Sequence, residues 1–177
     1  MTKEISAILA IGPRNVIGKG DKLAWYSKVD LEHFKKITTG NACLFGDTTF
    51  FGLPIYPLKN RLNLVLKKDL KKTTICDGYV GFNNVDKALK FCENYDKIFF
   101  CGGKSIYEHI FNNDLINTIY LTKIYSEKLE KEIDNNIEDY IILDVDFNKL
   151  INWLCVESQS EIRDGDLLVK FLKYSKK

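Results

Sequence analysis

The stretch FFCGGKSIYEHI, residues 99–110, decides the fold that this sequence predicts. It opens with an apolar run typical of a buried strand, and that run ends at Cys101. Two glycines follow, and we expect a helix to begin near Lys104 or Ser105. Paired glycines let the backbone approach a ligand closely, and the amino terminus of a helix favours phosphate. Because α/β proteins also use this pattern simply to turn from a strand into a helix, nucleotide binding and a plain turn both fit it.

The same alternation of strand and helix extends over most of the chain. The short apolar runs that predict buried strands are residues 5–11, 42–45, 62–66, 97–101 and 118–124. The stretches that predict helices between them are residues 30–38, about 47–52, 85–95 and 104–111. Strands that alternate with helices favour a mainly parallel sheet with helices on its faces.

The tail has a different pattern. NWLCVESQSEIRDGDLLVKFLKY, residues 152–174, contains two strand-like runs around Asp164-Gly165, which is a strong hairpin signal. No internal repeat or low-complexity linker divides the chain. The predicted fold class is therefore α/β, with one domain over residues 1–177, a central mostly parallel sheet flanked by helices, and an antiparallel hairpin at the carboxyl end.

The composition bounds the possible functions. The 177 residues are 45% hydrophobic and 28% charged, as in one ordinary globular domain. A net charge of +2 gives no reason to expect nucleic-acid or membrane binding. The five cysteines form no CxxC pair and there are only two histidines, which argues against a metal site, and the odd cysteine count argues against a secreted disulfide framework. Without a signal-peptide pattern or a run of eighteen apolar residues, we expect a cytoplasmic protein with reduced thiols.

A carboxylate lies at the edge of the first predicted helix's apolar face. Asp30, Phe34 and Ile37 are spaced i, i+4 and i+7, so they share one side of that helix. One interpretation is that Asp30 is the helix N-cap, a position that favours Asp. The other is that Asp30 lies in a pocket and binds a group with two parallel N–H donors, since an unpaired buried carboxylate is costly.

Further candidate binding groups flank predicted strands. In PLKNRLNLVLKKDL, residues 57–70, Arg61 comes just before a strand and can grip a carboxylate in bidentate fashion. Lys67 and Lys68 come just after it, where they can hold a phosphate or simply form a solvated strand end. In CLFGDTTF, residues 43–50, Gly46 opens a second turn from strand to helix.

Taken together, these segments resemble the dihydrofolate reductase family, in the same order and at nearly the same spacing. The combination is highly specific: an acid after a tryptophan-bearing loop, an L-x-x-R, a Gly-Gly before x-x-x-Tyr, and a late L-T. The matching stretches are ISAILAIGPRNVIGKGDKLAW (5–25), VDLEHFKK (29–36), PLKNRLNLVL (57–66), FFCGGKSIYEHI (99–110) and IYLTKI (119–124). They cover almost the whole chain.

The resemblance implies reduction of 7,8-dihydrofolate to 5,6,7,8-tetrahydrofolate, with hydride transfer from NADPH to C6 and protonation at N5 through water. In that reaction Asp30 is the acid that holds the 2-amino group and N3 of the pterin ring. The hydroxyl of Thr122 hydrogen-bonds this acid, and Trp25 shapes the same pocket through an ordered water. The resemblance further implies a monomer that binds dihydrofolate and antifolate-type inhibitors.

The resemblance also assigns the remaining binding residues. For the substrate, Leu31 and Phe34 pack on the pterin and benzoyl groups, Leu58 packs on the benzoyl ring, and Arg61 binds the glutamate α-carboxylate. Ile8 borders both the substrate and the nicotinamide. The implied NADPH-binding residues include a cis Gly-Gly peptide, a mobile covering loop and a lysine pair for the 2′-phosphate. They are Ala10, Ile17, Gly18, Gly46, Thr48, Thr49, Lys67, Lys68, Cys101, Gly102, Gly103, Lys104, Ser105, Ile106 and Tyr107.

Some positions depart from the family pattern. Asp47 stands where the family usually has Arg or Lys, so it should repel the cofactor phosphates and narrow the preference for NADPH over NADH. Ala24 stands where a proline usually precedes the tryptophan. The segment SEKLEKEIDNNIEDY, residues 126–140, is interpreted as a loop without the family's Gly-Asp, and no role is carried onto Asp134. Two alternatives are a reductase of the same fold acting on another heterocycle, such as the riboflavin-pathway reductase, and a non-catalytic binding protein.

Overall fold

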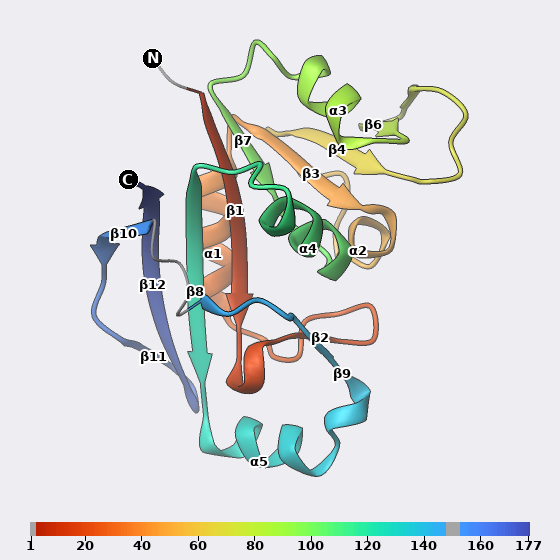
Figure 1. The fold of residues 1–177 in the computed structure, drawn as a ribbon. Helices are drawn as coiled ribbons and strands as arrows, with labels where there is room; N and C mark the ends of the chain where they lie inside the picture. The colour runs from red at the N-terminus through yellow and green to blue at the C-terminus, as the bar shows by residue number, and fades with distance from the viewer. Residues whose placement is uncertain (1–2, 148–152) are drawn as a thin grey trace.

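The structure is a computed structural model that describes residues 3–147 and 153–177. Within these residues a ten-stranded sheet runs through the molecule, with helices packed on both faces (Figure 1). Its strands are β1 (Glu4–Ile11), β3 (Ala42–Gly46), β4 (Leu62–Leu66), β5 (Thr74–Cys76), β6 (Tyr79–Phe82), β7 (Lys97–Phe100), β8 (Thr118–Tyr125), β10 (Trp153–Ser158), β11 (Ile162–Asp164) and β12 (Leu167–Lys176). The helices are α1 (Lys28–Thr38), α2 (Asp47–Phe51), α3 (Val85–Phe91), α4 (Lys104–Asn112) and α5 (Glu127–Asn135), with the 3-10 turns η1 (Pro13–Asn15) and η2 (Ile137–Asp139).

The centre of the sheet is parallel and its carboxyl-terminal side is antiparallel. β1 lies between β7 and β8, and β3 lies between β7 and β4, all in parallel register. β12 pairs antiparallel with β8, β10 and β11. The predicted α/β fold with a mostly parallel sheet and a carboxyl-terminal hairpin is therefore confirmed. The first residue of the predicted hairpin region, Asn152, lies outside the described residues.

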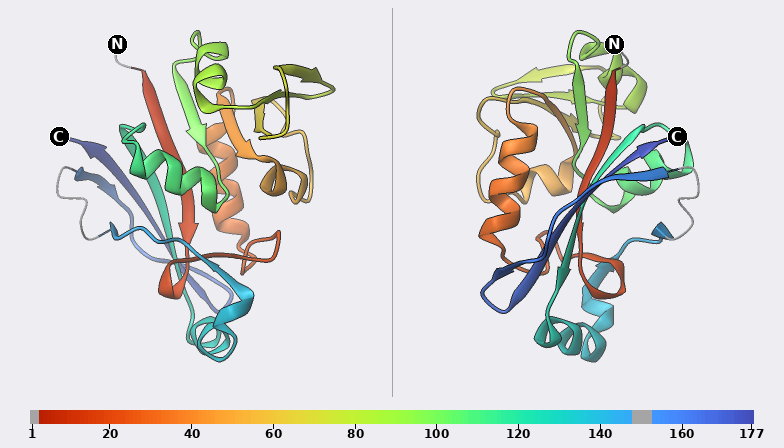
Figure 2. Two further views of the ribbon diagram at one scale, coloured as in Figure 1. Left: turned by 45° about the vertical axis from the view of Figure 1, so that its right-hand side comes forward. Right: turned by 90° about the vertical axis from the view of Figure 1, so that its left-hand side faces the viewer.

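The two faces of the sheet carry different helices, because successive side chains of a strand point to opposite sides. In β1, Ala7 and Leu9 belong to an apolar cluster with Ile110 of α4 and Ala88 of α3. Ile8 belongs to a cluster against which Phe34 and Ile37 of α1 pack. α1 therefore covers one face, and α3 and α4 cover the other (Figures 1 and 2).

The five predicted strands and four predicted helices are all present, with small differences at their ends. The largest difference is in α3, which ends at Phe91 rather than continuing to 95, and a turn follows from Cys92. The β5–β6 hairpin was not predicted. Its two-residue loop is Asp77-Gly78, where Gly78 has φ +81°, a backbone conformation that favours glycine.

Residues 126–140, interpreted from the sequence as a loop, contain α5, so that interpretation is wrong. Ser126 is the N-cap of α5, and its hydroxyl accepts a hydrogen bond from the Leu129 N–H. Leu129 and Ile133 lie one turn apart and are buried in a cluster with Val16. This buried stripe stabilises a helix whose remaining side chains are mostly charged.

A second, two-stranded sheet pairs β2 (Val16–Lys19) with β9 (Tyr140–Ile142). It ties the predicted covering loop, which contains Gly18, to the segment after α5. α5 itself lies below the end of β8 in both views of Figure 2. The guanidinium of Arg14 reinforces the link through two hydrogen bonds of 3.2 Å to the Asp134 carboxylate. Among the described residues, no helix is long and apolar enough to cross a membrane.

Candidate active site

Asp30 lies in the first turn of α1, where only 9% of the residue is exposed. The N-cap of this helix is Ser27, whose hydroxyl oxygen accepts a hydrogen bond of 3.1 Å from the Asp30 N–H. The interpretation of Asp30 as the N-cap is therefore wrong. Because Ser27 caps the helix, the carboxylate of Asp30 is not needed for that purpose.

The carboxyl-terminal hairpin supports the start of α1. Asp164, the last residue of β11, accepts hydrogen bonds from the Ser27 hydroxyl at 2.7 Å and from the Val29 N–H at 3.2 Å. The bond from Ser27 has the larger effect and the bond from Val29 the next, and both hold the pKa of Asp164 below its usual range. A carboxylate at a helix amino terminus also complements the helix dipole. Asp164 thus fixes the turn that carries Asp30.

Thr122 of β8 meets the carboxyl group of Asp30. Burial raises the pKa of Asp30 above its usual range, and a side-chain hydrogen bond with Thr122 lowers it in part. Thr122 pairs in register with Ala10 of β1 and with Phe171 of β12. The His33 ring of α1 stacks on Phe171 with centroids 3.8 Å apart, which seats the helix against this part of the sheet. No cation pairs with Asp30 among the described residues, so its charge is available to a ligand.

Trp25 packs on the backbone at the end of β1. A Cβ added to Gly12 would lie 2.9 Å from Cζ3 of the indole, so glycine is required for this close approach. The buried Nε1–H of Trp25 has no hydrogen-bond partner in the described part of the chain. A buried donor without a partner is costly, so this group fits the water-mediated role that the sequence predicts for Trp25.

Tyr107 links α4 to the middle of the sheet. Its hydroxyl donates a 2.8 Å hydrogen bond to the carbonyl of Ile8. Burial, and then the nearby Cys101 and Asp30, raise the pKa of Tyr107 well above its usual value, so Tyr107 keeps its proton and acts as a donor. Burial also raises the pKa of the Cys101 thiol, which makes this cysteine unreactive. Tyr107 therefore fixes the carbonyl of Ile8 in β1 from α4.

The predicted apolar contacts of the substrate lie along one side of α1 and in the segment before β4. Phe34 and Leu58 pack against the cluster that contains Ile8 and Cys101. Leu31 is 44% exposed, which places it at the rim rather than within the core. An apolar wall with one exposed leucine fits a flat heterocycle that reaches the surface.

Arg61 lies beyond this apolar wall. Its Nε donates to the carbonyl of Lys59 at 3.0 Å, and its Nη1 donates to the hydroxyl of Thr38 at 3.2 Å. The side-chain amide of the buried Asn63 bonds the Leu58 N–H and the carbonyls of Leu58 and Arg61, which holds the turn between them. Arg61 forms no ion pair with an acidic residue in the described chain.

The glycines of the predicted cofactor site lie together at the ends of β3 and β7. The Gly46 N–H donates to the carbonyl of Gly102 at 2.7 Å, and the peptide between Gly102 and Gly103 is cis, as predicted. Gly102 has φ +104°, and a Cβ on Gly103 would lie 2.6 Å from Oγ1 of Thr49. No side chain caps the amino terminus of α4, so its first N–H groups can bind an anion.

The charged residues predicted around the cofactor phosphates differ in placement. Nζ of Lys67 lies 5.6 Å from the centroid of the Phe51 ring, whereas Lys68 is exposed. The carboxylate of Asp47 accepts a 2.8 Å hydrogen bond from the Thr48 N–H, within the first turn of α2. Nζ of Lys104 pairs with Glu108 at 3.6 Å and points along its own helix. The predicted repulsion by Asp47 stays a prediction.

The remaining predicted cofactor residues lie in α4 and β2. Ile106 is buried, and its Cγ1 lies within van der Waals contact of a Cβ added to Gly46. Ser105 is exposed in the first turn of α4. Ile17 and Gly18 lie in β2, where Ile17 packs against the large core cluster and Gly18 approaches the carbonyl of Lys22.

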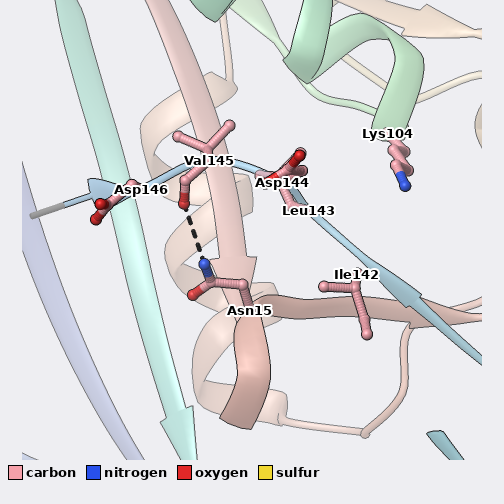
Figure 3. A pocket seen from close by; sticks show the side chains of 7 residues that line it. All are labelled: Asn15, Lys104, Ile142, Leu143, Asp144, Val145 and Asp146. Carbon is pink, nitrogen blue, oxygen red and sulfur yellow. Dashed lines mark hydrogen bonds between the residues drawn. The ribbon is translucent and has the colours of Figure 1, made fainter. Parts of the chain in front are cut away.

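A shallow cavity of about 400 Å³ lies beside the start of α4 (Figure 3). Its lining includes Lys104 and the segment after β9, and a 3.1 Å hydrogen bond joins two lining residues, from the Asn15 side chain to the Val145 carbonyl. Asp30 does not line it. Of the predicted site residues, only Lys104 borders this cavity.

Sequence reasoning missed several residues that support the site. They hold backbone turns or helix ends rather than contacting a ligand, and they are Gly12, Ser27, Thr38, Asn63 and Asp164. A buried asparagine in an apolar strand was a signal for Asn63, because buried amides are held by hydrogen bonds. Asp164 carried no such signal, since its partners lie far away in the sequence.

A buried carboxylate with no cationic partner among the described residues, together with a glycine-lined helix start, fits a class of enzyme that holds a nitrogen heterocycle and a phosphate-bearing cofactor. The family model that matches the chain is described as dihydrofolate reductase and covers residues 4–143. The chain belongs to the dihydrofolate reductase family.

Known relatives agree with this membership. The chain is 34% identical over 137 residues to a bifunctional dihydrofolate reductase-thymidylate synthase of Paramecium tetraurelia, a match that covers 76% of this chain and 29% of the relative. It is 29% identical over 175 residues to a dihydrofolate reductase of Bacillus subtilis, with 98% and 95% covered. The chain thus spans less than a third of the bifunctional relative and nearly all of the Bacillus one.

A solved structure has the same fold. It is a dihydrofolate reductase from Enterococcus faecalis complexed with NADP(H) and RAB-propyl. The TM-score is 0.78 at 22% sequence identity, and the match covers 98% of this chain and 96% of that one.

Proposed function

We propose that this chain reduces 7,8-dihydrofolate to 5,6,7,8-tetrahydrofolate with NADPH, in support of one-carbon metabolism and thymidylate synthesis. The observation that carries the proposal is the buried Asp30 carboxylate, which has a hydroxyl partner in Thr122 and no cation among the described residues. A 2-amino-4-oxo pterin edge offers two parallel N–H donors, which match a carboxylate with two charge-assisted hydrogen bonds.

The catalytic contribution of the chain is to hold and orient the substrate. Asp30 binds the 2-amino group and N3 of the pterin, and Thr122 fixes the direction of the carboxyl group. Trp25 holds a water in the same pocket, a role supported by its Nε1–H, which has no partner among the described residues. Protonation of N5 proceeds through water, since Asp30 holds the opposite edge of the ring. NADPH supplies the hydride when it is bound.

The cofactor is held mainly by backbone. The N–H groups at the start of α4, after Gly102-Gly103, would hold the pyrophosphate of NADPH, and Thr49 would add a hydroxyl next to Gly103. Lys67 and Lys68 would bind the 2′-phosphate as point charges. Ile8, with its carbonyl fixed by Tyr107, would border the nicotinamide.

The substrate's tail runs along the apolar wall toward Arg61. Phe34 and Leu58 pack on the benzoyl ring, and Leu31 covers the pterin at the rim. Arg61 then binds the glutamate α-carboxylate, because its guanidinium has no acidic partner in the described chain and its donor geometry matches a carboxylate.

The decisive experiment measures NADPH consumption by absorbance, with and without dihydrofolate, and with NADH in parallel. We expect consumption that depends on dihydrofolate and is faster with NADPH. A folded protein that consumes neither cofactor would support the non-catalytic alternative. Turnover of another heterocycle in place of dihydrofolate would support the alternative of a reductase of the same fold with a different substrate.

We also propose a single domain over residues 1–177, and a cytoplasmic monomer that binds antifolate-type inhibitors. The continuous sheet, with apolar clusters on both faces, supports one domain. All five cysteines are free thiols, which fits a reducing compartment.

A further inference from the structure

Thr38, the last residue of α1, has a fully buried side chain that the predicted reaction does not use. Its hydroxyl donates to the carbonyl of Phe34 at 2.8 Å and accepts from Nη1 of Arg61 at 3.2 Å. A hydroxyl has one proton and two lone pairs. Because the proton is committed to Phe34, the hydroxyl faces Arg61 as an acceptor only.

The guanidinium of Arg61 is thereby held at two points. The carbonyl of Lys59 fixes Nε at 3.0 Å, and the hydroxyl of Thr38 fixes Nη1. Two anchors on different nitrogens define the plane of a rigid group that carries five N–H donors. The remaining donors, including both on Nη2, have no partner in the described chain. An arginine oriented in advance loses less entropy when it binds a carboxylate.

We propose that Thr38 is a positioning residue that orients Arg61 toward the carboxylate tail of the substrate, and so sets the preference for substrates with such a tail over pterins that lack it. The inference rests on the proposed function and deepens it. Thr38 is fully buried and its hydroxyl bonds to Phe34 and Arg61, so it acts through Arg61 and not by touching the ligand.

The test compares two substrates in Thr38→Val, a change that keeps the side-chain shape and removes the hydroxyl. Loss of the anchor should raise the KM for dihydrofolate about fivefold to twentyfold, with kcat changed less than about twofold. The KM for 6-methyl-7,8-dihydropterin, which has the ring but no carboxylate tail, should not change. Thr38→Ser should keep the wild-type KM for dihydrofolate because serine retains the hydroxyl.

Arg61→Ala provides the reference for complete loss of the anchor. In that background Thr38→Val should have no further effect on the KM for dihydrofolate, because the two residues act in series. An equal rise of KM for both substrates would overturn the proposal and indicate a general effect on the fold. An unchanged KM for dihydrofolate would also overturn it.

Ligand binding separates this inference from the proposed function. Quenching of tryptophan fluorescence by folate and by 6-methylpterin should show the same selectivity, with weaker folate binding in Thr38→Val and unchanged pterin binding. If the wild-type protein bound folate without turning over dihydrofolate, the proposed reaction would fail while the role of Thr38 could still be confirmed or overturned by this measurement.

Discussion

The two ends of the candidate site are built in different ways. At the substrate end, Asp30 and Thr122 are buried side chains, drawn from α1 and β8. At the cofactor end, the contacts come from glycine backbone and the open start of α4, with exposed lysines around them. Side chains in a buried pocket select a ligand by the pattern of its hydrogen-bonding groups, whereas backbone N–H groups select only for negative charge.

This difference teaches where the chain tolerates change. The departures from the family pattern noted above at the phosphate end, such as Asp47, concern exposed or half-exposed positions. The acid and the hydroxyl of the buried end match the family pattern. Charge changes in solvent are screened, whereas the same changes inside a protein are not.

The largest effect is expected from Asp30→Asn. Removing the charge leaves the pterin edge with weaker hydrogen bonds in a buried site, a loss of about 3–4 kcal/mol. kcat/KM for dihydrofolate should therefore fall about 100- to 1,000-fold, as measured by NADPH consumption. Glu32→Gln, an exposed acid on the same helix, is the matched control and should retain activity. Comparable activity in Asp30→Asn would remove Asp30 from the mechanism.

The same variant should be more heat-stable than wild type near neutral pH. Burial raises the pKa of Asp30, so the folded state binds a proton more tightly than the unfolded chain does. The burial of Asp30 therefore does not lower the free energy of unfolding below the pKa that Asp30 has in the unfolded chain. The loss of stability grows as the pH rises through the higher pKa that Asp30 has in the folded state. The melting temperatures of Asp30→Asn and wild type should therefore converge in acid. A variant that melts lower than wild type at neutral pH would contradict this account.

Gly103→Ala should break the cofactor end. The added Cβ would meet Oγ1 of Thr49 at 2.6 Å, and such overpacking costs about 1–3 kcal/mol. Urea unfolding should show this loss, and NADPH should stabilise the variant less than it stabilises wild type. The double variant with Thr49→Ala relieves the contact and should regain most of the stability. If it did not, the strain would lie elsewhere.

Asp164→Asn tests the support of the substrate end from outside the pocket. The pKa of Asp164 is lowered in the folded state, so its carboxylate contributes stability above the unfolded pKa and loses it as the pH falls through the folded pKa. The variant should melt below wild type at neutral pH, and the difference should vanish in strong acid. Asp166→Asn removes a charge from the same hairpin turn but keeps the bonds of Asp164 to Ser27 and Val29, so it is the control and should melt close to wild type at neutral pH.

The smallest effect is expected from Asp47→Asn. Removing a partly exposed negative charge near the predicted phosphate site should tighten NADPH binding about two- to fivefold relative to NADH. The change should shrink with added salt, because salt screens exposed charges. Asp86→Asn, in the first turn of α3, should leave both affinities unchanged. Equal tightening for both cofactors would mean that Asp47 does not act on the 2′-phosphate.

Local patterns predicted the parts of the fold that depend on neighbouring residues. The strands of the parallel core were predictable from apolar runs, and the β11–β12 hairpin from Asp164-Gly165. The β5–β6 hairpin had the same signal in Asp77-Gly78, so that miss was avoidable. α5 was not predicted because most of its residues are charged and only two, Leu129 and Ile133, form its buried apolar stripe.

The candidate site was less predictable because its supports are long-range. Asp30 and Arg61 could be found by residue type and spacing. The contacts that hold them, from Asp164 to Ser27 and from Thr38 to Arg61, join segments that meet only after folding. No local propensity encodes such a pair, so only the tertiary structure reveals which polar residues support the site.

The hydrogen bond between Ser27 and Asp164 joins positions 137 residues apart. A ribosome makes the chain from its amino terminus, so α1 emerges well before the hairpin that fastens it. β12, which lies against the strand of Thr122, is synthesised later still. An unfinished chain therefore carries the pocket acid without the support that fixes its direction. The candidate pocket is therefore expected to reach its final geometry only after β11 and β12 have been synthesised and paired.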